Sequence, residues 1–310
     1  MVPSKWWTSS RGEAALPGPP FVQAVNLLDQ WWIMIDYRDI AEALGQGLEK
    51  HPELGDTIRL YCALLEIQDR AQVPPHQPAL TSAEAHARLE QGLPLMSPDE
   101  LDADPTSLAE LCARIGFTIA EHKREHVKAL AQIHAWLYER RHQIRTLAVE
   151  YLRSGGVSIS AAAGIDRGLL VFVLDSGLRP FLRAQAEALA PLVDDASWYR
   201  GYCPFCGGEP DMAALGKGNG RRRLLCSRCD SEWTFRRLGC PFCGTEEAGQ
   251  LPHYPSDDKV YRLGVCEGCR RYLKTIDLRE VAGEHPLAAE RILTAGMDQT
   301  AERMGYRGGM

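Results

Sequence analysis

The chain has 310 residues, of which 45% are hydrophobic and 25% are charged, so it is long enough for one large folded domain and a smaller one. Its net charge of -6 at pH 7 argues against nucleic acid as the main partner, because phosphate binding usually needs a basic surface. The longest strongly apolar run, Leu169 to Leu174, is far shorter than the ~18 residues that cross a membrane, which excludes a transmembrane helix.

Residues 1–19 carry neither the apolar core nor the cleavage site of a signal peptide, so we expect an unstructured or extended segment and a cytoplasmic protein. From residue 20 to residue 197 the apolar side chains recur at helical spacing, and no strand-like alternation competes. We therefore predict an all-α domain over residues 20–197. Its less sharply defined helices are expected around residues 22–50, 108–122 and 169–193, the last interrupted or kinked near Gly177 and Pro180.

Two helices have the clearest patterns. The stretch from Glu125 to Arg153 carries apolar residues three, four or seven positions apart, which predicts one long amphipathic helix that ends at a glycine pair. Residues 56–71 predict a second helix, with Asp56 or Thr57 as its N-terminal cap.

In the last third of the chain, cysteines and glycines become frequent and short segments alternate between apolar and polar residues. Residues 222–226 and 232–238 predict short strands, and Gly216 to Gly220 predicts the turn of a hairpin. We expect two tandem four-cysteine metal ribbons over residues 198–277, followed by a helical tail over residues 278–310. The expected fold is multi-domain: an all-α domain followed by a small metal-stabilised β module made of two metal ribbons.

Eight of the ten cysteines form four Cys-x-x-Cys pairs, a pattern that indicates metal binding. In a cytoplasmic chain, thiols stay reduced rather than forming structural disulfides. Two thiolates three residues apart chelate one ion from a tight turn, and a second turn completes a tetrahedron with metal–sulfur distances of ~2.3 Å. Gly207 and Gly244 follow two of the pairs and supply the positive φ that such a turn needs. The candidate metal ligands are Cys203, Cys206, Cys226, Cys229, Cys240, Cys243, Cys266 and Cys269.

The gaps between the pairs favour one arrangement of two sites. Gaps of 19 and 22 residues separate the first pair from the second and the third from the fourth, and each suits a hairpin, whereas the middle gap of 10 residues suits a connector. We therefore expect the first pair to join the second and the third to join the fourth. An interleaved arrangement, first with third, is the alternative. Spacing does not distinguish iron from zinc, because both take tetrahedral thiolate sites.

The simplest role for these metal ions is to hold the fold together. The ribbon region has few large aliphatic side chains, and a structural metal site contributes on the order of 10–16 kcal/mol to folding. A closed four-thiolate site leaves no coordination position for a catalytic water. The chain has no GxGxxG, P-loop or GxSxG motif, and no βαβ pattern that would suit a dithiol oxidoreductase. We therefore expect no enzyme activity, and no catalytic or cofactor-binding residues besides the metal ligands.

Two other groups of residues favour a structural role. His122 and His126 lie four residues apart and could bind a metal together, but their charged neighbours indicate a solvent-exposed helix face. Cys62 and Cys112 lie on apolar faces, which indicates core positions rather than nucleophiles.

A cluster of basic residues in the first ribbon could form a nucleic-acid face, with Trp233 and Phe235 as stacking partners. Arginines near a four-thiolate site would instead offset the negative charge of the site, and this structural interpretation is the stronger one. The basic residues are Lys217, Arg221, Arg222, Arg223, Arg228, Arg236 and Arg237.

The cysteine-rich region resembles a known family, that of the formate dehydrogenase accessory protein FdhE. Three stretches around the cysteine pairs carry the resemblance, and a weaker one lies nearer the N-terminus. All eight cysteines of the family pattern have counterparts here. The stretches are Tyr202 to Gly207, Arg223 to Trp233, Cys266 to Lys274, and His51 to Asp56 with the helix that follows it.

The resemblance implies a cytoplasmic factor that is needed for active respiratory formate dehydrogenase and that binds the catalytic subunit of this enzyme before export. It also implies that the β module is of double rubredoxin-like or zinc-ribbon type and holds two metal ions, with iron favoured and zinc as the alternative. We therefore expect a non-enzymatic maturation factor or chaperone for a molybdenum or tungsten formate dehydrogenase. A rubredoxin-like iron electron carrier is one alternative, and a nucleic-acid-binding zinc ribbon that uses Arg221 to Arg223 is the other.

Overall fold

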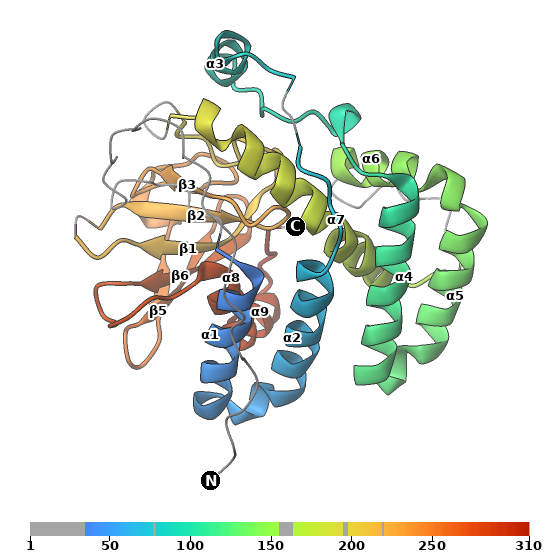
Figure 1. The fold of residues 1–310 in the computed structure, drawn as a ribbon. Helices are drawn as coiled ribbons and strands as arrows, with labels where there is room; N and C mark the ends of the chain where they lie inside the picture. Colours follow the sequence, from blue (N-terminus) through green and yellow to red (C-terminus); the bar gives the residue numbers. More distant parts are fainter. Residues whose placement is uncertain (1–34, 77–78, 155–163, 195–197, 219, 310) are drawn as a thin grey trace, which may run out of the picture. The chain divides into compact units, whose positions relative to one another are not determined.

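The computed structural model describes residues 35–76, 79–154, 164–194, 198–218 and 220–309. The expectations for residues 1–19 and for the start of the 22–50 helix lie outside this part of the chain. Before the sheet, the described residues form helices and no strand, as expected, and none of these helices combines the length and apolarity of a membrane span (Figure 1). The helices are α1 (Tyr37–Lys50), α2 (Gly55–Asp69), α3 (Ser82–Glu90), α4 (Pro105–His122), α5 (Val127–Glu139), α6 (Ile144–Ser154) and α7 (Arg167–Leu189).

The stretch from Glu125 to Arg153 forms two helices, so the expectation of one long helix is wrong. A 3-10 turn at Arg141–Gln143 separates α5 from α6. At the break, the guanidinium of Arg141 donates a 3.0 Å hydrogen bond to the carbonyl of Tyr138 in the last turn of α5. Apolar residues on both sides of the break are buried, so the apolar spacing continues through it and does not reveal it.

Three further details of the helical part differ from the sequence-based expectations. α2 begins at Gly55 directly after a 3-10 turn, so neither Asp56 nor Thr57 is its N-cap. α7 is not interrupted at Gly177 or Pro180, because most side chains around these positions are buried and their packing outweighs the lost hydrogen bond. α3 was not expected; a capping box at its start stabilises it.

The cysteine-rich region forms two three-stranded antiparallel ribbons. The first hairpin turns at Gly216 to Gly220, as predicted, and the N–H of Gly216 donates to the carbonyl of Arg221 at 2.9 Å. The third strand ends at Phe235 rather than Leu238, whose side chain is exposed. The strands are β1 (Pro210–Leu215), β2 (Arg222–Cys226), β3 (Glu232–Phe235), β4 (His253–Pro255), β5 (Tyr261–Cys266) and β6 (Arg271–Asp277).

The two ribbons form one continuous sheet, with strand order β3-β2-β1-β6-β5-β4 (Figure 1). The joining pair is β1 with β6, which run parallel from Met212 opposite Lys274 to Leu215 opposite Asp277. After the sheet, the expected helical tail contains two short helices, α8 (Leu287–Leu293) and α9 (Ala295–Arg303). A helical part followed by a β module with two four-cysteine groups is therefore the observed fold class.

Three clusters of buried side chains hold the described residues together. The main core contains apolar side chains from α2 to α7 together with Cys203, Cys226 and Cys229 from the first ribbon. The second core packs α1, α2 and α8 against β1, β2 and β6. The third core is small and lies between the second ribbon and α9; it consists of Leu263, Val265, Tyr272, Ala301 and Tyr306.

Candidate metal centres

The structure brings the eight paired cysteines into two groups of four. In each group all four Sγ atoms lie within 4.8 Å of one another. The first pair joins the second and the third joins the fourth, which is the arrangement that the gap lengths favour, and the interleaved arrangement is wrong. Centre 1 consists of Cys203, Cys206, Cys226 and Cys229, and centre 2 of Cys240, Cys243, Cys266 and Cys269.

The sulfur–sulfur distances fit a tetrahedral ion. In centre 1, Sγ of Cys206 lies 3.4 Å from Sγ of Cys226 and 3.5 Å from Sγ of Cys229. In centre 2 the distances are 3.7 Å between Cys240 and Cys269 and 3.6 Å between the other two cysteines. Four sulfurs at ~2.3 Å from one metal are about 3.8 Å apart, whereas a disulfide bond is only ~2.05 Å long. The donor set and its geometry therefore suit one tetrahedral metal ion in each centre.

A residue with positive φ follows each of the four cysteine pairs. Gly207 and Gly244 have φ of 69° and 78°, as predicted, and each donates its N–H to the carbonyl of the first cysteine of its pair at 3.0 Å. In the other two pairs the same position holds Asp230 and Arg270, with φ of 55° and 58°. Non-glycine residues are uncommon in this region of φ, so neighbouring contacts must stabilise both turns.

Asp230 follows Cys229 of centre 1 and binds three arginines from the surrounding helices. Arg179 and Arg183 reach it from α7, and Arg291 reaches it from α8 at 3.0 Å. Burial raises the pKa of Asp230, but the guanidinium of Arg179, followed by those of Arg291 and Arg183, lowers the pKa to about 2. The carboxylate is therefore charged, and it ties the turn of centre 1 to two helices that the sequence motif does not include.

Further contacts cover centre 1 from the helical part. The N–H groups of Leu95 and Met96 donate at 2.8 Å to the carbonyls of Pro204 and Phe205, which lie between Cys203 and Cys206. Arg228, between the cysteines of the second pair, donates at 3.0 Å to a carbonyl of α6 and brings a positive charge to the thiolates. Centre 1 is thus enclosed by protein on several sides.

Centre 2 is more open to solvent. Cys240 and Cys266 are buried, whereas Cys243 is exposed and Cys269 is half-buried. Burial raises the pKa of the Cys240 thiol, while a backbone hydrogen bond at Thr245 lowers the pKa of the Cys243 thiol. Centre 2 therefore presents a sulfur atom that external reagents can reach.

The other candidates from the sequence do not assemble into sites. Among the described residues, the groups of histidine, cysteine and carboxylate side chains close enough to share a metal are the two centres, and they include neither His122 nor His126. Cys112 is buried, and burial raises the pKa of its thiol to about 12. Cys62 is half-buried, and burial raises its pKa as well. Both therefore fit core positions.

The nucleic-acid interpretation loses its stacking partners, because Trp233 and Phe235 are only 0% and 3% exposed. Two of the arginines nearby are also engaged within the protein. Arg223 pairs with Glu232, and Arg222 donates at 2.9 Å to a backbone carbonyl. These basic side chains therefore act within the β module.

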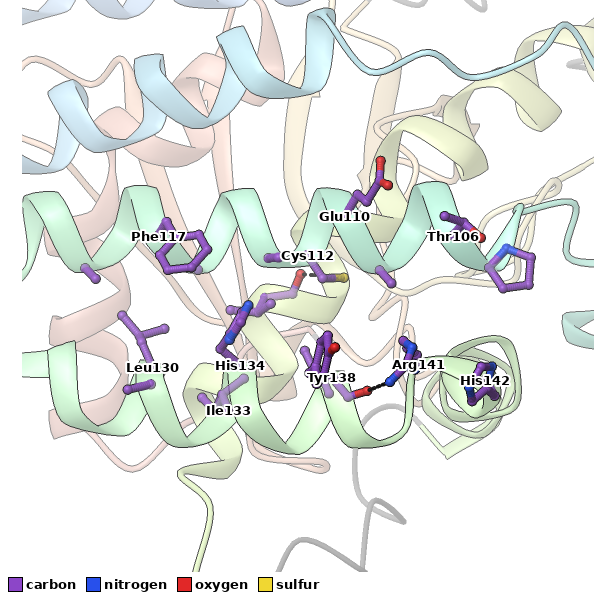
Figure 2. A pocket seen from close by; sticks show the side chains of 18 of the residues that line it. Thr106, Glu110, Cys112, Phe117, Leu130, Ile133, His134, Tyr138, Arg141 and His142 are labelled. Atoms are coloured by element: carbon purple, nitrogen blue, oxygen red, sulfur yellow. Dashed lines mark hydrogen bonds between the residues drawn. The ribbon is translucent and has the colours of Figure 1, made fainter.

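A pocket of about 770 Å³ opens between α4 and α5 (Figure 2). Small and apolar residues form most of its wall, and Cys112 and Val173 contribute to its lining. Phe117 on α4 and His134 on α5 face each other, with ring centroids 5.0 Å apart. The pocket lies in the helical part, away from both cysteine groups in the sequence, and the raised pKa of Cys112 argues against a nucleophile there.

Comparison with known proteins shows what the chain is similar to. The family model described as FdhE, central domain, matches residues 202–237, which contain all four cysteines of centre 1. Over 269 residues the chain is 25% identical to the "Protein FdhE homolog" of Aquifex aeolicus, covering 83% of this chain and 88% of that protein. Over 297 residues it is 28% identical to the "Protein FdhE homolog" of Pseudomonas putida, covering 89% and 84%.

A shorter match and a solved structure agree with these relatives. Over 111 residues the chain is 32% identical to "Protein FdhE" of Escherichia coli, which covers 34% of this chain and 35% of that protein. The crystal structure of the FdhE protein from Pseudomonas aeruginosa shares the fold, with a TM-score of 0.60 and 22% identity over 87% of this chain and 92% of that one. Over most of its length the chain is therefore similar in sequence to FdhE homologues, its first cysteine group lies in a region that matches the FdhE central domain, and it shares the fold of an FdhE protein.

Proposed function

We propose that this protein is a non-enzymatic accessory factor that binds the catalytic subunit of a formate dehydrogenase during assembly of that enzyme in the cytoplasm. The observation that carries the proposal is the pair of closed four-cysteine groups in a chain that is similar to FdhE homologues over most of its length. Each group would hold one metal ion through its four thiolates. The family resemblance favours iron, with zinc as the alternative.

The donor sets support a role in binding rather than in hydrolysis. Four cysteines complete a tetrahedron, so a metal ion in either centre has no free position for a substrate or a water. The ion would fix two turns of the chain in each ribbon, and centre 1 would also fix the ribbon to the helices around it. A rigid scaffold of this kind suits a protein that presents a surface to a partner.

The pocket between α4 and α5 is the surface that we assign to the catalytic subunit. Phe117 and Tyr138 line it and are 59% and 62% exposed, and Val127 adds a third exposed apolar side chain. Large apolar side chains that gather on one exposed surface are typical of protein-binding sites. An apolar segment of the catalytic subunit would bury these side chains.

Co-purification tests this proposal. Tagged protein, prepared without oxygen, is mixed with the catalytic subunit of formate dehydrogenase and, separately, with an unrelated molybdoenzyme subunit. We expect recovery of the first and not of the second. The double variant Phe117→Ser and Tyr138→Ser should lose most of this recovery, while the control Tyr254→Ser, on an exposed strand outside the pocket, should keep it. Equal recovery of both subunits would contradict the proposal.

One observation favours a second function, that of an iron electron carrier. The exposed Cys243 would bring a redox-active ion close to the surface, where electrons can enter or leave. A carrier of this kind would show the visible absorption of a ferric thiolate, and dithionite would bleach it reversibly. A colourless protein with two zinc ions per chain would exclude this alternative.

A further inference from the structure

The two centres differ in how they are built into the protein. Three cysteines of centre 1 belong to the main core, whereas no cysteine of centre 2 belongs to any of the three cores found among the described residues. Centre 2 also exposes Cys243. Opening centre 1 would therefore disrupt packing with several helices of the main core, while opening centre 2 would leave that packing intact.

The segment Tyr306–Gly309, here called the closing segment, lies against the fourth cysteine pair. The N–H of Arg307 donates to the carbonyl of Arg270 at 2.9 Å, and the N–H of Tyr272 donates to the carbonyl of Arg307 at 3.0 Å. The hydroxyl of Tyr306 donates to Glu267 at 2.5 Å, and the guanidinium of Arg270 lies 4.0 Å from the centre of the Tyr306 ring. Glu267 lies between Cys266 and Cys269, and Arg270 follows them, so the segment holds this turn directly.

The closing segment also lies close to the third pair. A Cβ on Gly309 would lie 2.1 Å from the carbonyl oxygen of Pro210 and 3.5 Å from the ring of Phe242. Phe242 stands directly before Cys243, and its ring lies under the guanidinium of Arg271 at 4.0 Å. The segment therefore contacts the turn of the fourth pair and lies close to the turn of the third, and only a residue without a side chain fits at Gly309.

Centre 2 is linked through this segment to α9. Tyr306 and Tyr272 belong to the third core with Ala301 of α9, and the hydroxyl of Tyr272 donates to Asp298 of α9 at 2.8 Å. The third core has only five buried members, so it contributes little stability by itself.

We infer that centre 2 is an exchangeable metal site and that its metal orders the closing segment and α9. The inference depends on the proposed function only in that centre 2 binds a metal ion. When the ion leaves, the four cysteine sulfurs of centre 2 are no longer held together. The two turns can then move apart, and the closing segment loses the surface on which it packs. Because coupling is reciprocal, the closing segment in turn raises the metal affinity of centre 2. Centre 1 keeps its ion, since the helices enclose it.

Metal release from the whole chain tests the exchange. Protein loaded with zinc is treated with excess of a colorimetric chelator, and the released zinc is followed with time. We expect two zinc ions per chain. The ion in centre 2 should leave at least tenfold faster than the ion in centre 1, because centre 1 is coupled more strongly to the rest of the fold. Cys243→Ser should remove the fast phase. Cys206→Ser is the matched control at the same position of the same Cys-Pro-Phe-Cys-Gly motif, and it should keep the fast phase.

Hydrogen exchange tests the link to the closing segment. In Cys243→Ser, the amides of Arg307 and Tyr272 should exchange about tenfold faster than in the parent protein, while the amide of Leu278, which donates to Leu215 at 3.0 Å, stays protected. Cys206→Ser should leave the Arg307 amide unchanged. Unchanged exchange at Arg307 in Cys243→Ser would overturn the link.

The variant Tyr306→Phe tests the coupling from the other side without changing a cysteine. It removes the bond to Glu267 and keeps the ring, so zinc should leave centre 2 about fivefold faster and centre 1 at the parent rate. If zinc leaves centre 2 of Tyr306→Phe at the same rate as in the parent protein, the coupling is refuted. Simultaneous loss of both ions from the parent protein would overturn the exchangeable site, whereas a chain that takes up no metal would instead contradict the proposed function.

Discussion

Asp230 should contribute strongly to the stability of this structure, because it pairs with three arginines. Asp230→Asn keeps the shape of the side chain and its tolerance of positive φ, but removes the charge that three arginines share. All of these arginines are largely buried. Arg179 and Arg291 keep Asp175 and Asp211 as partners, but the buried Arg183 loses its ion pair with Asp230. Removing one partner from a buried ion pair typically costs about 3–5 kcal/mol, and we expect a loss of this size in the free energy of unfolding.

Urea unfolding, followed by circular dichroism, measures this effect. Arg270→Asn is a matched control, because Arg270 holds the same position after the fourth cysteine pair with a φ of 58°. Its ion pair with Glu267 is half exposed, so its loss should cost under ~1 kcal/mol of global stability. Equal losses in the two variants, or a loss under 1 kcal/mol for Asp230→Asn, would refute the claim that the arginine cluster anchors centre 1.

Three more predictions follow from particular contacts. The pKa of Asp230 falls from 3.8 to about 2 on folding, so its ionisation should contribute about 2 kcal/mol to the free energy of unfolding. This contribution should be nearly complete above pH 4 and should be lost as the pH falls to 2. Urea titrations should show the loss in the parent protein and not in Asp230→Asn. Gly177→Ala places a Cβ 2.6 Å from Sγ of Cys112, so it should cost ~1–3 kcal/mol in thermal unfolding, and Cys112→Ala should recover most of the loss. Cys203→Ser changes a residue of the main core and should lower the melting temperature of the helical circular dichroism signal at 222 nm. Cys240→Ser lies outside the cores and should leave this temperature nearly unchanged. Equal effects of the two variants would contradict the claim that only centre 1 is built into the main core.

The cysteine groups could be predicted from the sequence because their information is local. A Cys-x-x-Cys pair and the glycine after it describe one turn, and the gap lengths describe which turns meet. The first hairpin was predictable for the same reason, since its glycine-rich turn lies between the two strands that it joins. These features depend on residues close together in the chain.

Other features depend on residues that are far apart in the chain and carry no local signal. The parallel pairing of β1 with β6 joins positions about 60 residues apart, and no turn motif in the sequence predicts it. The arginines around Asp230 lie on α7 and α8 and look like ordinary helix residues in the sequence. One local clue was present: an aspartate occupies the position at which two other pairs have glycine, and a residue held at positive φ needs partners.

The parallel pairing of β1 with β6 also limits how this protein can be divided. The repeated cysteine motif makes the two ribbons look like modules that could be separated at the connector between Phe235 and Cys240. Each half, expressed alone, would expose the long edge of β1 or of β6, with backbone groups free to pair with another chain. Half-proteins cut there should aggregate, and co-expression of both halves should restore a soluble product by rebuilding the missing neighbour.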